Sequence, residues 1–291
     1  MNIKLALTCP IYNCLSYTKE FVKSIVTEYP FDLIFHDNGS NDGSETWISD
    51  ASNFTDIPNL EKIHVIRSDR NLGVAKGANS AMQKAYSLPD VTHIIYMNND
   101  ILLRQETLDN LVWAWENKPD DKLMLISGEG FHRETFGTVE EAFTAFRTYR
   151  IAPVSTTSHN TIPLLTMRFG ACYCLFIWDK KAIDTVGWLD EGFELGYFDD
   201  NDHAETILEK GYLLAHFSGA PFFHYGSVTM KINNIDNGFT FERNKQRFFT
   251  KHNITDEAVD ATKRFPQAVA RIEEINKIWK KNPPKITQIG R

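Results

Sequence analysis

The sequence predicts an α/β fold with a mostly parallel central sheet flanked by helices, followed by a C-terminal helical extension. In the first half, short apolar segments of strand length alternate with segments whose apolar residues recur at helical spacing. Strands that alternate with helices form βαβ units, whose parallel sheet is covered on both faces. The composition agrees, since 42% hydrophobic and 24% charged residues are ordinary for a globular protein.

Each expected element follows from its local pattern. Short apolar segments rich in β-branched or aromatic residues predict strands at 3–9, 31–36, 62–67, 93–97 and 123–127. Helical spacing predicts helices at 17–29, 44–51, 75–87 and 105–115. In the second half we expect strands at 169–178 and 212–217, an acidic turn leading into a helix over 193–211, and closing helices at 241–251 and 266–281. The polar stretch 129–163 is expected to form a long excursion or lid, and this stretch and the segment 228–238 are expected to shape a substrate site or to close over it.

The charge is unevenly distributed along the chain. The 31 Lys and Arg residues against 38 Asp and Glu give a net charge of −7, which argues against a protein whose whole surface binds nucleic acid. Residues 263–291 carry eight basic and two acidic residues, so this tail is +6 and the remaining 262 residues are −13. Such a tail indicates either an anionic partner or a solvated helix face.

No segment reaches the 18 apolar residues of a membrane span, and the N-terminus lacks the apolar core of a signal peptide. The four cysteines, Cys9, Cys14, Cys172 and Cys174, do not match zinc-site spacings and are expected to be buried, reduced thiols. We therefore expect a cytoplasmic protein with no integral membrane segment.

Polar or glycine-rich segments follow four consecutive predicted strands, at 8–13, 36–44, 67–79 and 98–100. Because ligands bind beyond the carboxyl ends of parallel strands, these segments predict one binding cleft. Asp37 can accept an N–H group of a base, and the helix that opens near Gly73 can direct backbone amides at phosphate. The glycine spacing is neither that of a dinucleotide-binding fingerprint nor that of a P-loop.

Two further sets of residues suggest chemistry. Asp100 ends a buried strand and can hold a divalent ion, although a helix cap is the alternative; His224 is either structural or a second ligand. The carboxylates of Asp199, Asp200 and Asp202 are crowded, and crowding can raise the pKa of a carboxyl towards the range of a general base. An acidic helix N-terminus is the alternative.

In this order the motifs resemble the inverting glycosyltransferases of family 2, which have the GT-A fold, and most closely the rhamnosyl- and galactofuranosyl-transferase-like subgroup. The resemblance runs from about residue 3 to 251 and rests on Thr8-Cys9-Pro10-Ile11-Tyr12-Asn13, Asp37-Asn38-Gly39-Ser40-Asn41-Asp42-Gly43-Ser44, Asn71-Leu72-Gly73, Asn98-Asn99-Asp100, Gly170-Ala171-Cys172, Asp199-Asp200, Asp202, His224 and Arg243-Asn244. It implies a GT-A domain over 1–251, with a nucleotide-sugar-binding half (1–128) and an acceptor and catalytic half (129–251). Residues 252–291 would be a basic helical extension.

By position, the resemblance implies a role for each matching residue. The UDP- or dTDP-linked sugar donor would contact Thr8, Pro10, Tyr12, Asp37, Asn71, Gly73, Asn98 and Asn99. Asp100 would bind Mn²⁺ or Mg²⁺ on the diphosphate with His224 as second ligand, and Asp200 would be the base that deprotonates the acceptor hydroxyl. Asp199 would orient that hydroxyl, while Asp202 and Arg243 would contact the acceptor. The metal motif begins with Asn98 rather than Asp, which leaves one carboxylate and gives His224 more weight.

The expected reaction is a single displacement that inverts the anomeric carbon, with a glycan, a lipid-linked glycan or a hydroxylated nucleobase as acceptor. One alternative is a sugar-nucleotide nucleotidyltransferase, but residues 9–16 contain no glycine, Lys or Arg for the loop that such an enzyme needs. A non-catalytic nucleotide- or carbohydrate-binding module is the other. The tail, with the apolar stripe Phe265, Val269, Ile272, Ile275 and Trp279, could lie peripherally on an anionic membrane, approach nucleic-acid phosphates, or pack on the core.

Overall fold

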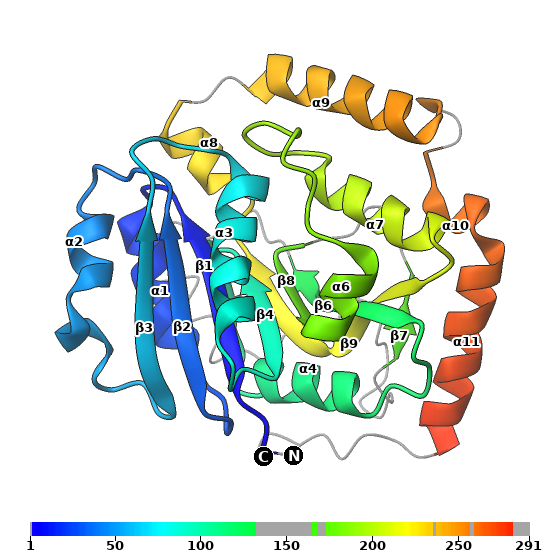
Figure 1. The fold of residues 1–291 in the computed structure, drawn as a ribbon, viewed down its shortest axis with the longest axis horizontal. Coiled ribbons are helices and arrows are strands. Elements are labelled where there is room, and N and C mark those ends of the chain that lie inside the picture. Colours follow the sequence, from blue (N-terminus) through cyan, green and yellow to red (C-terminus); the bar gives the residue numbers. More distant parts are fainter. Residues whose placement is uncertain (1, 132–163, 168–172, 235–236, 257–258, 282–291) are drawn as a thin grey trace.

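A computed structural model describes residues 2–131, 164–167, 173–234, 237–256 and 259–281. These residues form one sheet of nine strands with helices on both faces (Figure 1). The strand order is β3 (Leu60–Arg67), β2 (Phe31–Asp37), β1 (Leu5–Ile11), β4 (His93–Met97), β8 (Leu175–Asp179), β6 (Leu123–Phe131), β9 (Leu213–His224) and β5 (Ile101–Leu103), and β7 (Leu165–Thr166) pairs with β9. β1, β2, β3, β4, β6 and β9 run in one direction, and β5, β7 and β8 run in the other. The predicted mostly parallel α/β sheet is confirmed.

The burial of the strands explains their sequences. Every residue of β2 and β4 is buried, because helices cover both faces, and both strands therefore have apolar centres, at 33–35 and 94–97, that do not alternate with polar residues. The edge strand β3 is half-buried to exposed and correspondingly more polar. In the parallel register Ile11 of β1 lies opposite Asp37 of β2, so the segments that follow these strands start at the same edge of the sheet.

The helices of the first half lie close to their predicted positions: α1 (Leu15–Ser24), α2 (Ser44–Ser49), α3 (Val74–Ser87) and α4 (Thr107–Glu116), with a 3₁₀ turn at Ala51–Phe54. The second half contains α6 (Lys180–Val186), α7 (Asp199–Glu209), α8 (Val228–Ile232), α9 (Asn237–His252), α10 (Ala261–Arg264) and α11 (Pro266–Lys281). Helix α3 packs on β1 and β2, α4 packs on β6 and β9, and α9 lies across the top of the molecule near α7 and α8 (Figure 1).

The C-terminal helix α11 packs against the domain. Ile272, Ile275 and Trp279 are buried in the main hydrophobic core. The Trp279 indole donates a hydrogen bond to the Asn117 carbonyl (3.1 Å) and lies edge-on to Trp113, with ring centroids 5.3 Å apart. The idea that this stripe lies on a membrane is therefore wrong for these three side chains, because the sheet and α4 already cover them.

Several expectations fall partly or wholly outside the described residues: most of the 129–163 excursion, the Gly170-Ala171-Cys172 motif, and the end of the basic tail. The prediction of buried, free thiols is confirmed for Cys9, Cys14 and Cys174. Within the described part of the chain, no helix is long and apolar enough to cross a bilayer.

Candidate active site

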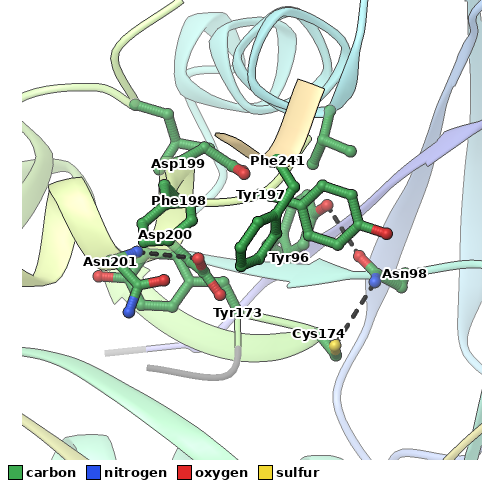
Figure 2. A pocket seen from close by; sticks show the side chains of 12 residues that line it. Tyr96, Asn98, Tyr173, Cys174, Tyr197, Phe198, Asp199, Asp200, Asn201 and Phe241 are labelled. Carbon is green, nitrogen blue, oxygen red and sulfur yellow. Dashed lines mark hydrogen bonds between the residues drawn. The ribbon is translucent and has the colours of Figure 1, made fainter. Parts of the chain in front are cut away.

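Two adjoining pockets lie at the carboxyl ends of the parallel strands. The first pocket is formed by the ends of β1 and β4, the start of α3, the loop before α7 and the segment leading into α8: Pro10, Ile11, Tyr12, Asn38, Asn71, Gly73, Val74, Tyr96, Asn98, Asn99, Asp100, Leu195, Gly196, Tyr197, His224, Ser227, Val228, Thr229 and Met230. The second pocket lies against the N-terminus of α7: Val74, Tyr96, Asn98, Tyr173, Cys174, Leu189, Tyr197, Phe198, Asp199, Asp200, Asn201 and Phe241 (Figure 2). Because Val74, Tyr96, Asn98 and Tyr197 line both, the pockets form one cleft.

Most of the residues proposed from sequence line this cleft. Pro10, Tyr12, Asn71, Gly73, Asn98, Asn99, Asp100 and His224 line the first pocket, and Asp199, Asp200 and again Asn98 line the second. Thr8, Asp37, Asp202 and Arg243 line neither. Four strand ends and the acidic turn are therefore brought together as the order of motifs suggested.

Asp37 and Thr8 are engaged inside the protein. Asp37 is fully buried, and its carboxylate accepts hydrogen bonds from the Ser40 backbone N–H and from Arg67, each at 2.9 Å. The Thr8 hydroxyl donates to the carbonyl of Ile95 at 3.2 Å. Asp37 thus shapes the turn at the end of β2.

Asn38 is the pocket-lining residue of this turn, and the sequence reasoning missed it. It is buried, its amide donates to the Gly73 carbonyl (3.3 Å), and its side-chain oxygen accepts from the Leu72 N–H (3.4 Å). The available signal was its place directly after the second strand, next to Asp37.

Gly73 is where the first half of the chain meets the loop before α7. Its φ of +90° suits glycine, and a Cβ at this position would lie 2.6 Å from the backbone nitrogen of Leu195. The Gly73 N–H donates to the Asn71 side chain (2.9 Å) and the Val74 N–H to the Leu195 carbonyl (3.2 Å). These two amides at the start of α3 are therefore bonded within the protein rather than directed at a phosphate.

Asp100 and His224 come together through pairing of the short strand β5 with β9, in which Ile101 lies opposite His224. The Nε2 atom of His224 is 3.3 Å from a carboxylate oxygen of Asp100, and the two side chains are 13% and 7% exposed. Asn98 contributes no charge here; its side-chain oxygen accepts from the Tyr96 hydroxyl at 2.9 Å, and its amide lies 3.5 Å from the sulfur of Cys174.

Asp100 and His224 fit a divalent ion that binds together with a diphosphate. Among the described residues, no group of three or more His, Cys, Asp or Glu side chains is placed to hold a metal. A carboxylate and an imidazole nevertheless suit an ion whose other ligands are phosphate oxygens and water, as Mg²⁺ sites at diphosphates usually are.

Asp199 and Asp200 begin α7 after a backbone that turns through the left-handed region. Burial raises the pKa of Asp199 to about 6, and the charge of Asp202 adds to the shift. Asp200 is half-buried, and the Asn201 N–H donates to its carboxylate at 2.8 Å. In Figure 2 the Asp200 side chain lies across the second pocket from Tyr96 and Asn98. Asp200 is thus a partly exposed carboxylate in the pocket that adjoins the one lined by Asp100 and His224.

Asp202 and Arg243 join α9 to α7 and to the loop before it instead of lining the cleft. Asp202 is 2% exposed and pairs with Lys251 (2.7 Å) and His252 (2.9 Å) of α9. Arg243 pairs with Glu194 at 2.8 Å. Phe241, which the sequence reasoning did not single out, is the α9 residue that lines the second pocket.

Comparison with solved structures shows the same fold. Similar structures include S. aureus TarS 1–349 (TM-score 0.54, 15% identity, 86% of this chain and 70% of that chain) and the mannosyltransferase PcManGT from Pyrobaculum calidifontis in complex with GDP-Man and Mn²⁺ (0.57, 13%, 98% and 77%). A third is GalNAc-T7 with UDP, GalNAc and Mn²⁺ (0.57, 12%, 85% and 48%). No curated protein sequence matches the chain significantly.

At these identities the structural likeness shows the fold alone, which is GT-A-like, with the C-terminal helices present. Nothing in the comparisons points to the rhamnosyl- or galactofuranosyl-transferase-like subgroup. The sequence model of glycosyl transferase family 2 matches residues 8–176, more than half of the chain. The chain therefore belongs to glycosyl transferase family 2 and is a glycosyltransferase that uses a nucleotide-sugar.

Proposed function

We propose that this glycosyltransferase moves a hexose or pentose from a UDP- or dTDP-sugar to an acceptor hydroxyl with inversion, using Asp200 as the base. The observation that carries the proposal is the continuity of the two pockets. Asp100 and His224 lie in one and Asp199 and Asp200 in the other, and the pockets meet at Tyr96 and Asn98. A diphosphate bound in the first pocket would therefore hold its sugar at the mouth of the second.

The donor would occupy the first pocket, with its nucleoside near Pro10, Tyr12 and Asn71 and its diphosphate near Asp100 and His224. When bound there, Mn²⁺ or Mg²⁺ would offset the charge that develops on the leaving nucleoside diphosphate. Two of the similar structures carry Mn²⁺ together with GDP-Man or with UDP and GalNAc, which supports this part of the proposal.

The chemical step needs one proton removed. The Asp200 carboxylate takes the proton of the acceptor hydroxyl, and the oxygen attacks the anomeric carbon from the face opposite the diphosphate. The bond from the anomeric carbon to the phosphate oxygen breaks, and its electron pair leaves with the nucleoside diphosphate. Asp199, whose pKa is raised to about 6 by burial, helps to orient the acceptor beside Asp200.

The second pocket would receive the acceptor. The rings of Tyr173, Phe198 and Phe241 line it, and aromatic faces suit either a sugar ring or a base. A glycan, a lipid-linked glycan and a hydroxylated nucleobase therefore all remain candidate acceptors. Asp202 would act on the acceptor only through the α7–α9 contact and Arg243 only through the loop before α7, since neither residue lines the pocket.

The test combines binding and turnover. A thermal-shift panel of UDP-, dTDP- and GDP-sugars with and without Mn²⁺ should show stabilisation by at least one donor, because a ligand that binds only the folded state raises its stability. With that donor, Asp200→Asn should lose transfer by about 100-fold or more while donor stabilisation persists. Asp56→Asn, which makes the same change at an exposed carboxylate, is the matched control and should keep wild-type transfer.

Three outcomes separate the alternatives. Wild-type turnover by Asp200→Asn would show that another group is the base. Formation of a nucleotide-sugar from a nucleoside triphosphate and a sugar 1-phosphate would favour the nucleotidyltransferase. Donor binding by the wild type without any transfer across an acceptor panel would favour the binding module.

A further inference from the structure

The loop that leads into α7 has an unusual backbone. Leu195, Gly196, Tyr197 and Phe198 all have positive φ, at 62°, 152°, 70° and 64°. Residues other than glycine rarely adopt this region, because Cβ then crowds the neighbouring carbonyl oxygen. Such a backbone persists only where the surrounding structure holds it, and here it directly precedes Asp199 and Asp200.

One side chain of α9 bonds this loop at three points. The amide nitrogen of Asn244 donates to the carbonyl oxygens of Gly196 (2.8 Å), Glu194 (3.0 Å) and Tyr197 (3.2 Å). Asn244 is 1% exposed, so these hydrogen bonds are shielded from water. Only a side chain with donors can do this, since a carboxylate would place negative charge against three carbonyl oxygens.

The neighbours of Asn244 along α9 pack on the same loop. The Phe241 ring lies 5.6 Å from that of Tyr197 and 5.2 Å from that of Phe198, and Phe248 lies 5.5 Å from Phe198. On its other side the loop touches Gly73, where even a Cβ would meet the Leu195 backbone. The loop is thus held between the start of α3 and α9.

We propose that Asn244 is a positioning residue for the transfer reaction. It holds the loop 194–198 in its left-handed conformation and thereby fixes where α7 begins and where the Asp200 carboxylate lies in the cleft. The proposal rests on the proposed function of Asp200 as the base. Asn244 itself lines neither pocket, so its effect is exerted through the loop.

The arrangement predicts a larger effect on turnover than on donor binding. Asp100 and His224, the residues proposed to hold the diphosphate, belong to β4–β5 and β9, whereas Leu195, Gly196 and Tyr197 of the loop line another part of the same pocket. Removing the Asn244 amide should therefore displace Asp200 and lower kcat more than it lowers donor affinity.

The experiment compares Asn244→Ala and Asn244→Asp with Gln246→Ala, which removes an exposed amide from the same helix. Three quantities are measured: kcat with the acceptor, the affinity for the nucleoside diphosphate with Mn²⁺, and hydrogen–deuterium exchange over 194–202. Both Asn244 variants should lose about 10- to 100-fold in kcat, the loss expected of a slightly misplaced catalytic group, with a smaller loss of donor affinity. Exchange over 194–202 should rise, and Gln246→Ala should behave as wild type in all three.

A suppressor distinguishes positioning from general damage. Adding Leu195→Gly to Asn244→Ala should restore part of kcat and slow the exchange, because glycine adopts positive φ without steric cost. The proposal is overturned if Asn244→Ala keeps wild-type kcat, if exchange over 194–202 is unchanged, or if donor affinity falls as much as kcat does. Failure of the proposed function looks different: Asp200→Asn would then retain transfer, or no donor would be used, while the exchange data would still decide whether Asn244 holds the loop.

Discussion

The Nε2 atom of His252 lies 2.9 Å from the carboxylate of Asp202, which joins the last turn of α9 to the first turn of α7. The other ring nitrogen faces Glu209 at 3.0 Å, so both nitrogens of the buried ring have a carboxylate partner. Burial alone would lower the pKa of His252, but the hydrogen bonds to Asp202 and Glu209 outweigh it and raise the pKa above its ordinary value. The imidazolium form is therefore the one that the fold favours.

Replacing His252 should give a pH-dependent loss of stability. A raised folded-state pKa means that the stabilisation is fully present below the unfolded pKa, near 6.5, and is lost as pH rises through the folded value. We expect His252→Gln to lower the free energy of unfolding by about 1–3 kcal/mol at pH 5.5 and by less at pH 9. Urea unfolding at both pH values measures this, and an equal loss at the two would contradict it.

Replacing Asp199 should instead give a gain in stability that depends on pH. Because burial raises its pKa to about 6, the folded protein holds the proton more tightly than the unfolded chain, and stability falls as pH rises from about 4 to about 6. Asp199→Asn removes this cost and should stabilise the protein at pH 8 by up to about 3 kcal/mol, with little gain at pH 4. Urea unfolding across that range tests the prediction. A gain that does not change with pH would show that packing, not ionisation, is responsible.

The pair Asp100 and His224 should control the effect of the metal on the donor. Asp100→Asn and His224→Gln should each weaken Mn²⁺-dependent binding of the nucleoside diphosphate by at least about tenfold, because each removes a proposed ligand. Binding without Mn²⁺ should change little. Calorimetric titration with and without Mn²⁺ measures both, with Asp56→Asn as control. Undiminished metal dependence in both variants would place the ion elsewhere.

Helix α11 should behave as part of the core. Trp279 is 3% exposed and packs against Trp113 and Phe217, so Trp279→Ala should lower the free energy of unfolding by about 3–5 kcal/mol. Lys280→Ala, at the adjacent exposed position, should change it by less than about 0.5 kcal/mol. Denaturant unfolding of the two variants is the measurement. Similar stability of both would mean that α11 is an appendage.

Local patterns sufficed for the first parallel strands and most long helices, whereas β9 extends seven residues beyond its predicted end at residue 217. β4 and α11 have the predicted bounds, and β2 and α3 differ from their predicted bounds by one residue. These elements could be predicted because an apolar run or an apolar stripe at helical spacing depends only on residues that are close in the sequence. The short strands β5 and β7 were missed, since they exist only through pairing with the long strand β9. The cytoplasmic location and the domain limits stay predictions.

The cleft could be predicted in outline for a similar reason. Strand ends meet at one edge of a parallel sheet, which brought Asn71, Asn98 and Asp100 to one pocket. The sequence could not show that Arg67 would form a hydrogen-bonded ion pair with Asp37, because Arg67 belongs to the neighbouring strand β3. Nor could it show Asn244 bonding carbonyl groups about fifty residues earlier in the chain.

The position of α9 over the loop also sets an order of events during synthesis. Synthesis of the chain up to Met230 supplies every side chain of the first pocket. The contacts that restrain the loop before Asp200 come from Phe241, Asn244 and Phe248, which are synthesised later. A growing chain therefore contains every side chain of the first pocket before it contains the residues that restrain the loop, although Leu195, Gly196 and Tyr197 of that loop line the pocket. The loop can take its final conformation only after α9 has left the ribosome and packed against it.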